Sequence, residues 1–143
     1  LKILGFDTKL IPVEGRSLSG AVFEAARSGR ILLTRDSGIK RCSGNVSFIM
    51  IREQHWTDQL RKIVREIPME LEAGRIFTRC TVCNELLGPV PAEEGASLAP
   101  PLVRERNCRY FRCPSCGRLY WEGSHRDSVL SRLSEIGIWG HNT

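Results

Sequence analysis

Four cysteines stand in two C-x-x-C pairs, and their spacing predicts a metal site. Cys80 pairs with Cys83, Cys113 pairs with Cys116, and Gly117 after the second pair favours a tight turn. Thiolates on two short turns are the ligands of a tetrahedral structural zinc ion. Four thiolates leave no open coordination position, so this metal would stabilise the fold and take no part in a reaction. We therefore expect a zinc ribbon.

Three other uses of these cysteines compete with a structural zinc ion. A thioredoxin-like redox pair needs one C-x-x-C between a strand and a helix, not two matched pairs. Rubredoxin-like iron takes the same four thiolates, and the spacing does not separate iron from zinc. Disulfides are disfavoured because no export signal is visible, and we expect a reducing, cytoplasmic location. Cys42 and Cys108 are left over and are expected to be free thiols.

A second set of residues could hold a different kind of metal. Asp36 follows a hydrophobic run that predicts a strand, and ligands bind at the carboxyl ends of strands in open parallel sheets. An aspartate there suits Mg²⁺ or Mn²⁺. Phosphodiester hydrolysis by a metal needs two or more convergent carboxylates, and Asp7 and Glu24 are further acids of this segment. A lone aspartate after a strand is also typical of a turn or helix cap, which composition by itself favours.

Basic and aromatic residues gather around the second cysteine pair. Arg109, Arg112, Arg118 and Trp121 could bind single-stranded RNA through phosphate contacts and base stacking. Alternatively, the aromatic side chains fill the small core of the ribbon while the arginines are solvated, and the spacing does not decide. Arg35, beside Asp36, could attract a phosphate group.

The elements that must position these residues change along the chain. In the first segment a helix is expected to begin at Ser17 or Ser19 and to stop at Gly29. Strands are expected at 31–34 and 46–51, an extended stretch at 6–13, and a helix at 56–67 that Pro68 ends. Strands that alternate with helices predict a parallel sheet with crossover helices.

The second segment has a different pattern. A strand is expected at 75–79, before the first cysteine pair, and a loop rich in proline and glycine at 88–101. Residues 109–112 lead into the second pair and residues 118–121 leave it, and Cys108 is expected to lie in a strand. A sequence like a capping box at 124–127 predicts a C-terminal helix. We therefore expect an α/β domain at 1–72, followed by a zinc ribbon with a C-terminal helix at 73–143.

Composition limits the class of protein. The chain has 143 residues, of which 41% are hydrophobic and 26% are charged, and this indicates a folded globular protein. No apolar run is long enough to predict a membrane-spanning helix, so no membrane partner is expected. The formal net charge of +5 is a mild excess that identifies no partner by itself.

Several short motifs occur together in one order. They are Leu4-Gly5-Phe6-Asp7-Thr8, a run that ends in Thr34-Arg35-Asp36, the two cysteine pairs, and Tyr120-Trp121-Glu122-Gly123-Ser124-His125. In this order they resemble the mutator-seven C-terminal RNase domain family, a PIN-like nuclease fold followed by a zinc ribbon. The resemblance covers nearly the whole chain.

The resemblance implies a ribonuclease that depends on Mg²⁺ or Mn²⁺. It matches Asp36 to the acid of the family's T-R-D motif, the principal metal ligand, and Asp7 to the aspartate of its G-F/Y-D-T motif. Glu24 would be an auxiliary acid, because this chain has Ser-Leu-Ser-Gly at 17–20 where the family often has an acid. The family's first strand and helix are expected before Leu1, so this fragment is expected to lack a complete active site. Strands exposed in this way could favour self-association.

Two functions follow from these features. The first is a PIN-like ribonuclease that acts on RNA and carries a structural zinc ribbon, which the Thr-Arg-Asp motif favours. The second is a non-catalytic zinc-ribbon module that binds RNA or protein, which the absence of an acid at 17–20 favours.

Overall fold

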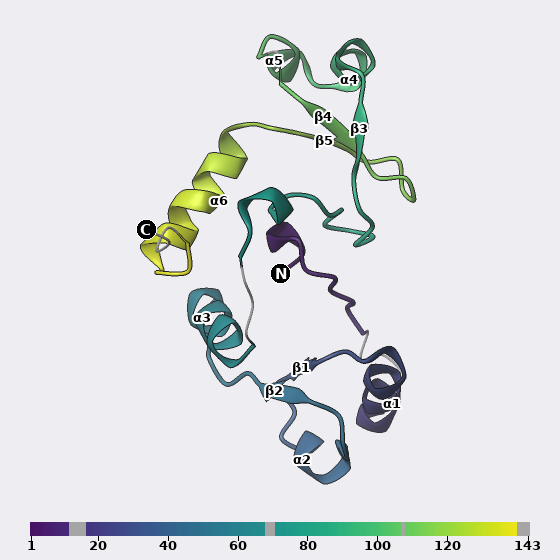
Figure 1. Cartoon of the computed structure of the whole chain (residues 1–143), viewed down its shortest axis with the longest axis vertical. Coiled ribbons are helices and arrows are strands. Elements are labelled where there is room, and N and C mark those ends of the chain that lie inside the picture. Colours follow the sequence, from purple (N-terminus) through teal and green to yellow (C-terminus); the bar gives the residue numbers. More distant parts are fainter. Residues whose placement is uncertain (12–16, 68–70, 107, 140–143) are drawn as a thin grey trace. The chain divides into compact units, whose positions relative to one another are not determined.

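The protein is described from a computed structural model that covers residues 1–11, 17–67, 71–106 and 108–139. The chain forms two compact units, and Figure 1 labels the elements of both. One unit contains Leu1–Lys9 together with Glu70–Thr143, and the other contains Leu10–Met69. The two domains expected at 1–72 and 73–143 remain a prediction. They differ from these units in the first nine residues, which pack with the cysteine-bearing part of the chain.

The unit of residues 10–69 is an α/β arrangement around a two-stranded parallel sheet. Its elements are α1 (Leu18–Ser28), β1 (Leu32–Thr34), α2 (Ile39–Cys42), β2 (Phe48–Met50) and α3 (Trp56–Glu66). Leu32 lies opposite Phe48 and Thr34 opposite Met50. α1 lies against both β1 and α2. The predicted small parallel sheet with flanking helices is confirmed.

Hydrophobic spacing explains the core of this unit. Val22 and Ala25 of α1, Ile39 of α2, Ile49 of β2 and Ile63 of α3 are all buried. Their side chains recur at helical or strand spacing, so each element presents one apolar face to the others. The core therefore fixes β1 and β2 side by side, with their carboxyl ends at the same edge.

Backbone conformation sets the ends of α1. Gly29 has a φ of +62° and its N–H donates to the Ala25 carbonyl, a left-handed helix end that glycine adopts without a steric penalty. Ser17 is the N-cap residue, but its side chain makes no capping hydrogen bond, and its Oγ lies 2.6 Å from the Oγ of Ser19. The predicted start and stop of this helix are confirmed.

The other unit is built on a three-stranded antiparallel sheet. Its elements are the 3₁₀ turns η1 (Lys2–Leu4) and η2 (Ala73–Arg75), the strands β3 (Gly88–Val90), β4 (Tyr110–Arg112) and β5 (Leu119–Trp121), and the helices α4 (Ala92–Leu98), α5 (Pro101–Arg104) and α6 (Ser124–Glu135). The strand order is β3-β4-β5. Cys80, Cys113, Tyr110 and Leu133 are buried in this unit. The predicted C-terminal helix is confirmed as α6.

The loop expected at 88–101 is wrong, because this stretch contains β3 and α4. Gly95 lies in the middle of α4, where glycine normally weakens a helix. A Cβ at this position would lie 2.3 Å from the ring of Tyr110. The helix can approach β4 closely only because the residue is glycine, and this tertiary contact was not visible in the composition.

The strand expected at 75–79 is also wrong. Arg75 ends η2, and Phe77 has a φ of +62°, a left-handed conformation that interrupts an extended chain. Arg79 pairs with Leu86 in an isolated bridge. The ring of Phe77 meets that of His125 edge to face, with the ring centroids 6.2 Å apart.

Two smaller expectations also differ from the structure. The capping box at 124–127 is wrong, because α6 begins after Gly123 with no side-chain capping hydrogen bond. Residues 6–11 of the expected extended stretch form no strand, and residues 12 and 13 lie outside the described residues, as does Pro68. The helix expected to end at residue 67 ends at Glu66.

Candidate functional site

The four cysteines of the two C-x-x-C pairs converge on one point. The Sγ atoms of Cys80, Cys83, Cys113 and Cys116 all lie within 4.8 Å of one another. The Sγ atoms of Cys80 and Cys116 are 3.8 Å apart. A tetrahedron with metal–sulfur bonds of about 2.3 Å has edges of about 3.8 Å, whereas a disulfide is about 2.05 Å long. The donor set therefore fits a structural tetrahedral metal ion and excludes a disulfide between these two.

Both C-x-x-C pairs have the same backbone geometry. The N–H of Asn84 donates to the Cys80 carbonyl (2.9 Å), and the N–H of Gly117 donates to the Cys113 carbonyl (3.0 Å). In addition, the N–H of Cys83 donates to the Sγ of Cys80 at 3.3 Å. Each pair is thus a tight turn that aims two sulfur atoms at one site, as a zinc knuckle requires.

The first nine residues contact the first knuckle, which is the turn of Cys80 to Cys83. The Nζ of Lys2 donates to the carbonyls of Thr81 (3.1 Å) and Val82 (2.8 Å). A cation beside this turn complements the charge of four thiolates around a divalent ion, which is −2 in total. Arg79 Nε donates to the Gly5 carbonyl at 3.0 Å, so two basic residues tie this segment to the knuckle.

The Cys80 thiol has a lowered pKa. Burial raises its pKa, but hydrogen bonds from the Tyr120 hydroxyl and from the N–H groups of Cys83 and Val82 outweigh burial and lower this pKa to about 6. Burial also raises the pKa of Tyr120, as does its hydrogen bond with Cys80, so the phenol keeps its proton at neutral pH. The Cys80 thiolate, which is the form that binds a metal, is therefore favoured.

Asp36 lies at the carboxyl end of β1, where the sequence placed it. Its N–H donates to the Thr34 Oγ1 (3.0 Å), and its Oδ1 accepts the N–H of Gly38 (2.8 Å). These bonds form the turn that leads into α2, so Asp36 does serve as a turn residue. Its side chain is exposed, and among the described residues its Oδ2 has no hydrogen-bond or ion-pair partner. This oxygen is available to a cation.

The other two predicted acids are Asp7 and Glu24. Asp7 belongs to the cysteine-bearing unit, and its Oδ1 accepts a hydrogen bond from the Nδ2 of Asn84 at 2.6 Å. Glu24 is half-buried in the middle of α1. Within the described ranges the cysteines are the one group of three or more potential metal ligands that converge. The carboxylates described do not by themselves form a Mg²⁺ or Mn²⁺ site, and the catalytic roles of Asp36, Asp7 and Glu24 remain predictions.

Glu53 is not among the site residues predicted from the sequence, although it follows β2 as Asp36 follows β1. The two strands are parallel neighbours, and the Nη2 of Arg35 donates to the Oε1 of Gln54 at 3.4 Å between the two strand exits. Asp36 and Glu53 therefore leave the same edge of the sheet. The sequence could have indicated Glu53, because it follows the second hydrophobic strand. Ligands bind at the carboxyl ends of the strands in open parallel sheets.

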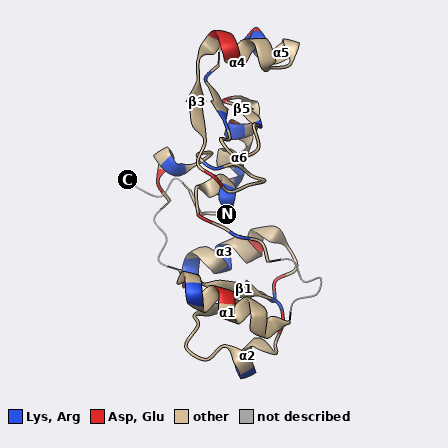
Figure 2. Ribbon diagram, turned by 90° about the vertical axis from the view of Figure 1, so that its right-hand side faces the viewer, with Lys and Arg blue, Asp and Glu red and all other residues tan. Residues whose placement is uncertain are grey.

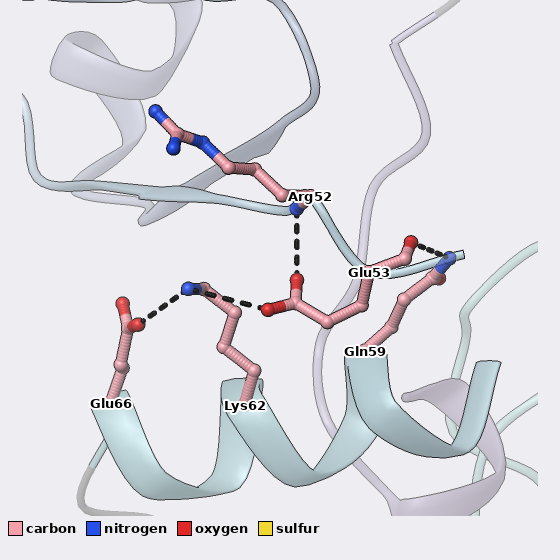
Figure 3. Close-up of polar contacts among 5 residues, drawn as sticks. All are labelled: Arg52, Glu53, Gln59, Lys62 and Glu66. Carbon is pink, nitrogen blue, oxygen red and sulfur yellow. Dashed lines mark hydrogen bonds and ion pairs between the residues drawn. The ribbon is translucent and has the colours of Figure 1, made fainter. Parts of the chain in front are cut away.

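Glu53 is held in a small polar cluster that Figure 3 draws. Its Oε2 accepts the N–H of Arg52 (2.8 Å), and its Oε1 lies 3.6 Å from the Nζ of Lys62, which is 3.1 Å from the Oε1 of Glu66. Gln59 Nε2 donates to the Glu53 carbonyl at 3.1 Å. Hydrogen bonds from the backbone N–H groups of Glu53 and Arg52 lower the pKa of this carboxyl group. Glu53 is therefore ionised at neutral pH.

Two of the predicted RNA-binding arginines make ion pairs. Arg109 forms a two-armed contact with Glu122, with distances of 2.9 and 2.7 Å, and Arg112 pairs with Glu94 of α4 at 2.8 Å. Figure 2 shows the acidic residues of α4 in red. Both pairs are partly exposed, so solvent screens them.

Arg118 and Trp121 are the more open members of this set. Arg118 is exposed, and no hydrogen bond or ion pair of its side chain occurs among the described residues. Trp121 is 41% exposed at the end of β5, opposite Tyr110 of β4. Tyr110 is buried and fills the core, whereas Trp121 presents an aromatic surface. As cross-strand partners these two side chains lie on the same face of the sheet, and their burial distinguishes them.

Comparisons with known proteins agree with the motifs. No helix of the described residues combines the length and the apolar character that crossing a membrane requires. No curated protein and no solved structure matches the chain. The family model of the Mut7-C RNAse domain matches residues 1–133, which includes both cysteine pairs, Asp36 and the start of α6. The expected family is confirmed, and the chain belongs to the Mut7-C RNAse domain family.

Proposed function

We propose that this protein is a ribonuclease that hydrolyses phosphodiester bonds of RNA with Mg²⁺ or Mn²⁺, and that its cysteine quartet holds a structural zinc ion. The observation that carries the proposal is the position of Asp36, exposed at the carboxyl end of β1 in a chain of an RNase family. Oxygen ligands at this edge suit a hard cation, which binds phosphate oxygens and activates water in enzymes of this chemistry.

Asp36 would be the principal ligand, and Glu53 is the acid nearest to it in the topology of the sheet. Asp36 and Glu53 follow neighbouring parallel strands, so both acids lie at the same edge of the sheet. This shared position supports a cation site at that edge. Glu24 of α1 stays an auxiliary candidate. Asp7 is the weaker candidate, because its carboxylate already accepts a hydrogen bond from Asn84. Among the described residues no three carboxylates converge, so the site would need a further ligand or water molecules to hold the cation.

The zinc ion would be structural, because four thiolates leave it no open position. The ribbon also offers a surface for single-stranded RNA, made of Arg118, Trp121 and the ion-paired Arg109 and Arg112. Arginine contacts to phosphate and stacking of a base on the exposed tryptophan are the physical basis. Arg35, next to Asp36, is placed to attract a phosphate group at the sheet edge.

The alternative function is a module that binds RNA without cleaving it. The observation that favours it is that no three carboxylates of the described residues converge. In this case the cysteine quartet and the arginines would form the whole functional surface. Only an activity measurement separates the two functions.

The test is cleavage of an end-labelled single-stranded RNA by the purified full-length protein with Mn²⁺, compared with the same reaction in chelator. Asp36→Asn keeps the size of the side chain and removes the charge. We expect a loss of cleavage of about 100-fold or more, as for other electrostatic groups of active sites. Asp127→Asn, an exposed aspartate in the first turn of α6, is the matched control and should cleave as the wild type does.

Retained cleavage in Asp36→Asn would overturn the role of Asp36. RNA binding that survives in chelator, with no cleavage by wild type or variant, would favour the binding module. Zinc is measured separately by metal analysis of the purified chain, with one ion per chain expected. A chain with iron in its place would correct the identity of the metal and leave the nuclease proposal untouched.

A further inference from the structure

Tyr120 joins the two halves of the cysteine site. Its hydroxyl oxygen lies 3.1 Å from the Sγ of Cys80, 3.2 Å from the N of Thr81 and 3.2 Å from the Oγ1 of Thr81. Tyr120 belongs to β5, the strand that follows the second knuckle, whereas Cys80 and Thr81 belong to the first. Its register, opposite Phe111 of β4, is set by the hairpin that carries Cys113 and Cys116.

The directions of these hydrogen bonds follow from the chemistry of the groups. The backbone N–H of Thr81 can only donate, so the phenol oxygen accepts there. The phenol proton then remains for a second partner, and the Cys80 sulfur is the partner that carries charge in a metal site. Cys80 is fully buried, with 0% of its surface exposed. Its sulfur therefore depends on protein groups for its hydrogen bonds.

We propose that Tyr120 is a positioning residue of the metal site, whose hydroxyl donates to the Cys80 thiolate and keeps its sulfur in the tetrahedral arrangement. This inference rests on the proposed zinc ion. Donors behind the ligands orient them and are typically worth about 10- to 100-fold in metal affinity. Here the donor comes from β5, the strand that follows the second knuckle. The hydrogen bond therefore also links the turn of Cys80 and Cys83 to the folding of the β4–β5 hairpin.

The chain supplies its own control, because it has two tyrosines in adjacent strands. The hydroxyl of Tyr110 lies 3.5 Å from the Val103 carbonyl. Its cysteine neighbour is Cys108, which lies outside the metal site, and among the described residues it forms no hydrogen bond with the four cysteines of the site. Tyr120→Phe and Tyr110→Phe each remove one hydroxyl and keep the aromatic ring. A difference between the two variants therefore measures the hydrogen bond to sulfur and not the loss of a phenol group in the ribbon.

The experiment is a zinc competition titration of the whole chain against a chromophoric chelator. Tyr120→Phe should bind zinc about 10- to 100-fold more weakly than the wild type, and Tyr110→Phe should stay within about twofold. A second readout uses Co²⁺ in place of zinc. Loss of a hydrogen bond to a thiolate raises the energy of its lone pairs, so the sulfur-to-cobalt charge-transfer band of Tyr120→Phe should move to longer wavelength.

Each result decides something different. Equal zinc affinity and an unchanged cobalt spectrum in Tyr120→Phe would overturn the role of Tyr120 while leaving the zinc site intact. Equal weakening in both tyrosine variants would also overturn it, because packing and not the bond to sulfur would then be responsible. A wild-type chain that binds no zinc would overturn the zinc proposal itself, together with this inference.

Discussion

Asn84 and Gly117 occupy equivalent places in the two knuckles of the cysteine site. Each directly follows the second cysteine of its pair, and their φ angles are +71° and +70°. Each donates its N–H to the carbonyl of the first cysteine, Cys80 or Cys113. Left-handed backbone is open to glycine and tolerated by asparagine, which explains why these two residue types stand here.

A side chain at residue 117 should therefore strain the second knuckle. Gly117→Ala places a Cβ in the left-handed conformation, and we expect it to lower the free energy of unfolding by about 1–2 kcal/mol. Nothing lies within 4 Å of the position a Cβ would take, so the effect comes from the backbone alone. The measurement is chemical denaturation of the zinc-loaded chain.

Gly74→Ala is the control for this prediction, because residue 74 also has open space around a Cβ but no positive φ. It should change the free energy of unfolding by no more than about 0.5 kcal/mol, as exposed substitutions usually do. Equal effects of the two variants would contradict the strain at residue 117.

The cysteine quartet should carry much of the stability of its unit. Cys113→Ser replaces a fully buried ligand and should reduce zinc content and unfold the ribbon, because apparent binding energies of structural zinc are about 10–16 kcal/mol. Zinc analysis combined with thermal unfolding, with and without chelator, measures this loss. Cys42→Ser changes an exposed thiol outside the quartet and should leave both quantities unchanged. Cooperative melting of Cys113→Ser at the wild-type temperature would argue against a structural metal.

The contact between α4 and β4 should not tolerate a methyl group. Gly95→Ala would place a Cβ 2.3 Å from the Tyr110 ring, and overpacking of this kind costs about 1–3 kcal/mol. Gly20→Ala in α1 is the matched helical control, because its Cβ would meet only the Ser17 Oγ at 3.9 Å. It should stabilise the chain by up to about 1 kcal/mol through helix propensity. We expect the melting temperature to fall in Gly95→Ala and to rise in Gly20→Ala, each relative to the wild type. A higher melting temperature in Gly95→Ala would show that α4 and β4 are not in close contact.

Glu53 should contribute stability that depends on pH. Its pKa is lowered in the folded chain, so the unfolded chain binds a proton first as the pH falls. The contribution is therefore present above the unfolded pKa and is lost as the pH falls through the lowered, folded pKa. Lys62 has a raised pKa, chiefly through its bond to Glu66, so its contribution is lost only as the pH rises through that value.

Denaturation midpoints between acidic and neutral pH test this prediction. Glu53→Gln should be less stable than the wild type at neutral pH, and the two should converge in acid. Glu85→Gln, an exposed glutamate of the first knuckle, should follow the wild type across the whole range. A constant difference between Glu53→Gln and the wild type at every pH would rule out an ionised Glu53 as the cause.

Local rules account for the features that the sequence predicted well. α1 and α3 follow from apolar residues at helical spacing, and Gly29 ends the first of them through its own backbone freedom. The C-x-x-C spacing predicted that each pair would turn on itself, because only four consecutive residues are involved. These predictions needed no knowledge of distant parts of the chain.

Tertiary structure decided the features that depend on residues far apart in sequence. Asn84 holds Asp7 across 77 positions, and Tyr120 reaches Cys80 across 40. A glycine is needed at residue 95 of α4 because Tyr110 packs against it. Phe77 leaves the extended conformation where its N–H donates to the Ile3 carbonyl. The sequence by itself therefore predicted the four cysteines that converge and the helices α1 and α3, since sterics and spacing act between neighbours. The fold determined which side chains support them, because a hydrogen bond or a packing contact exists only once the chain has brought both partners together.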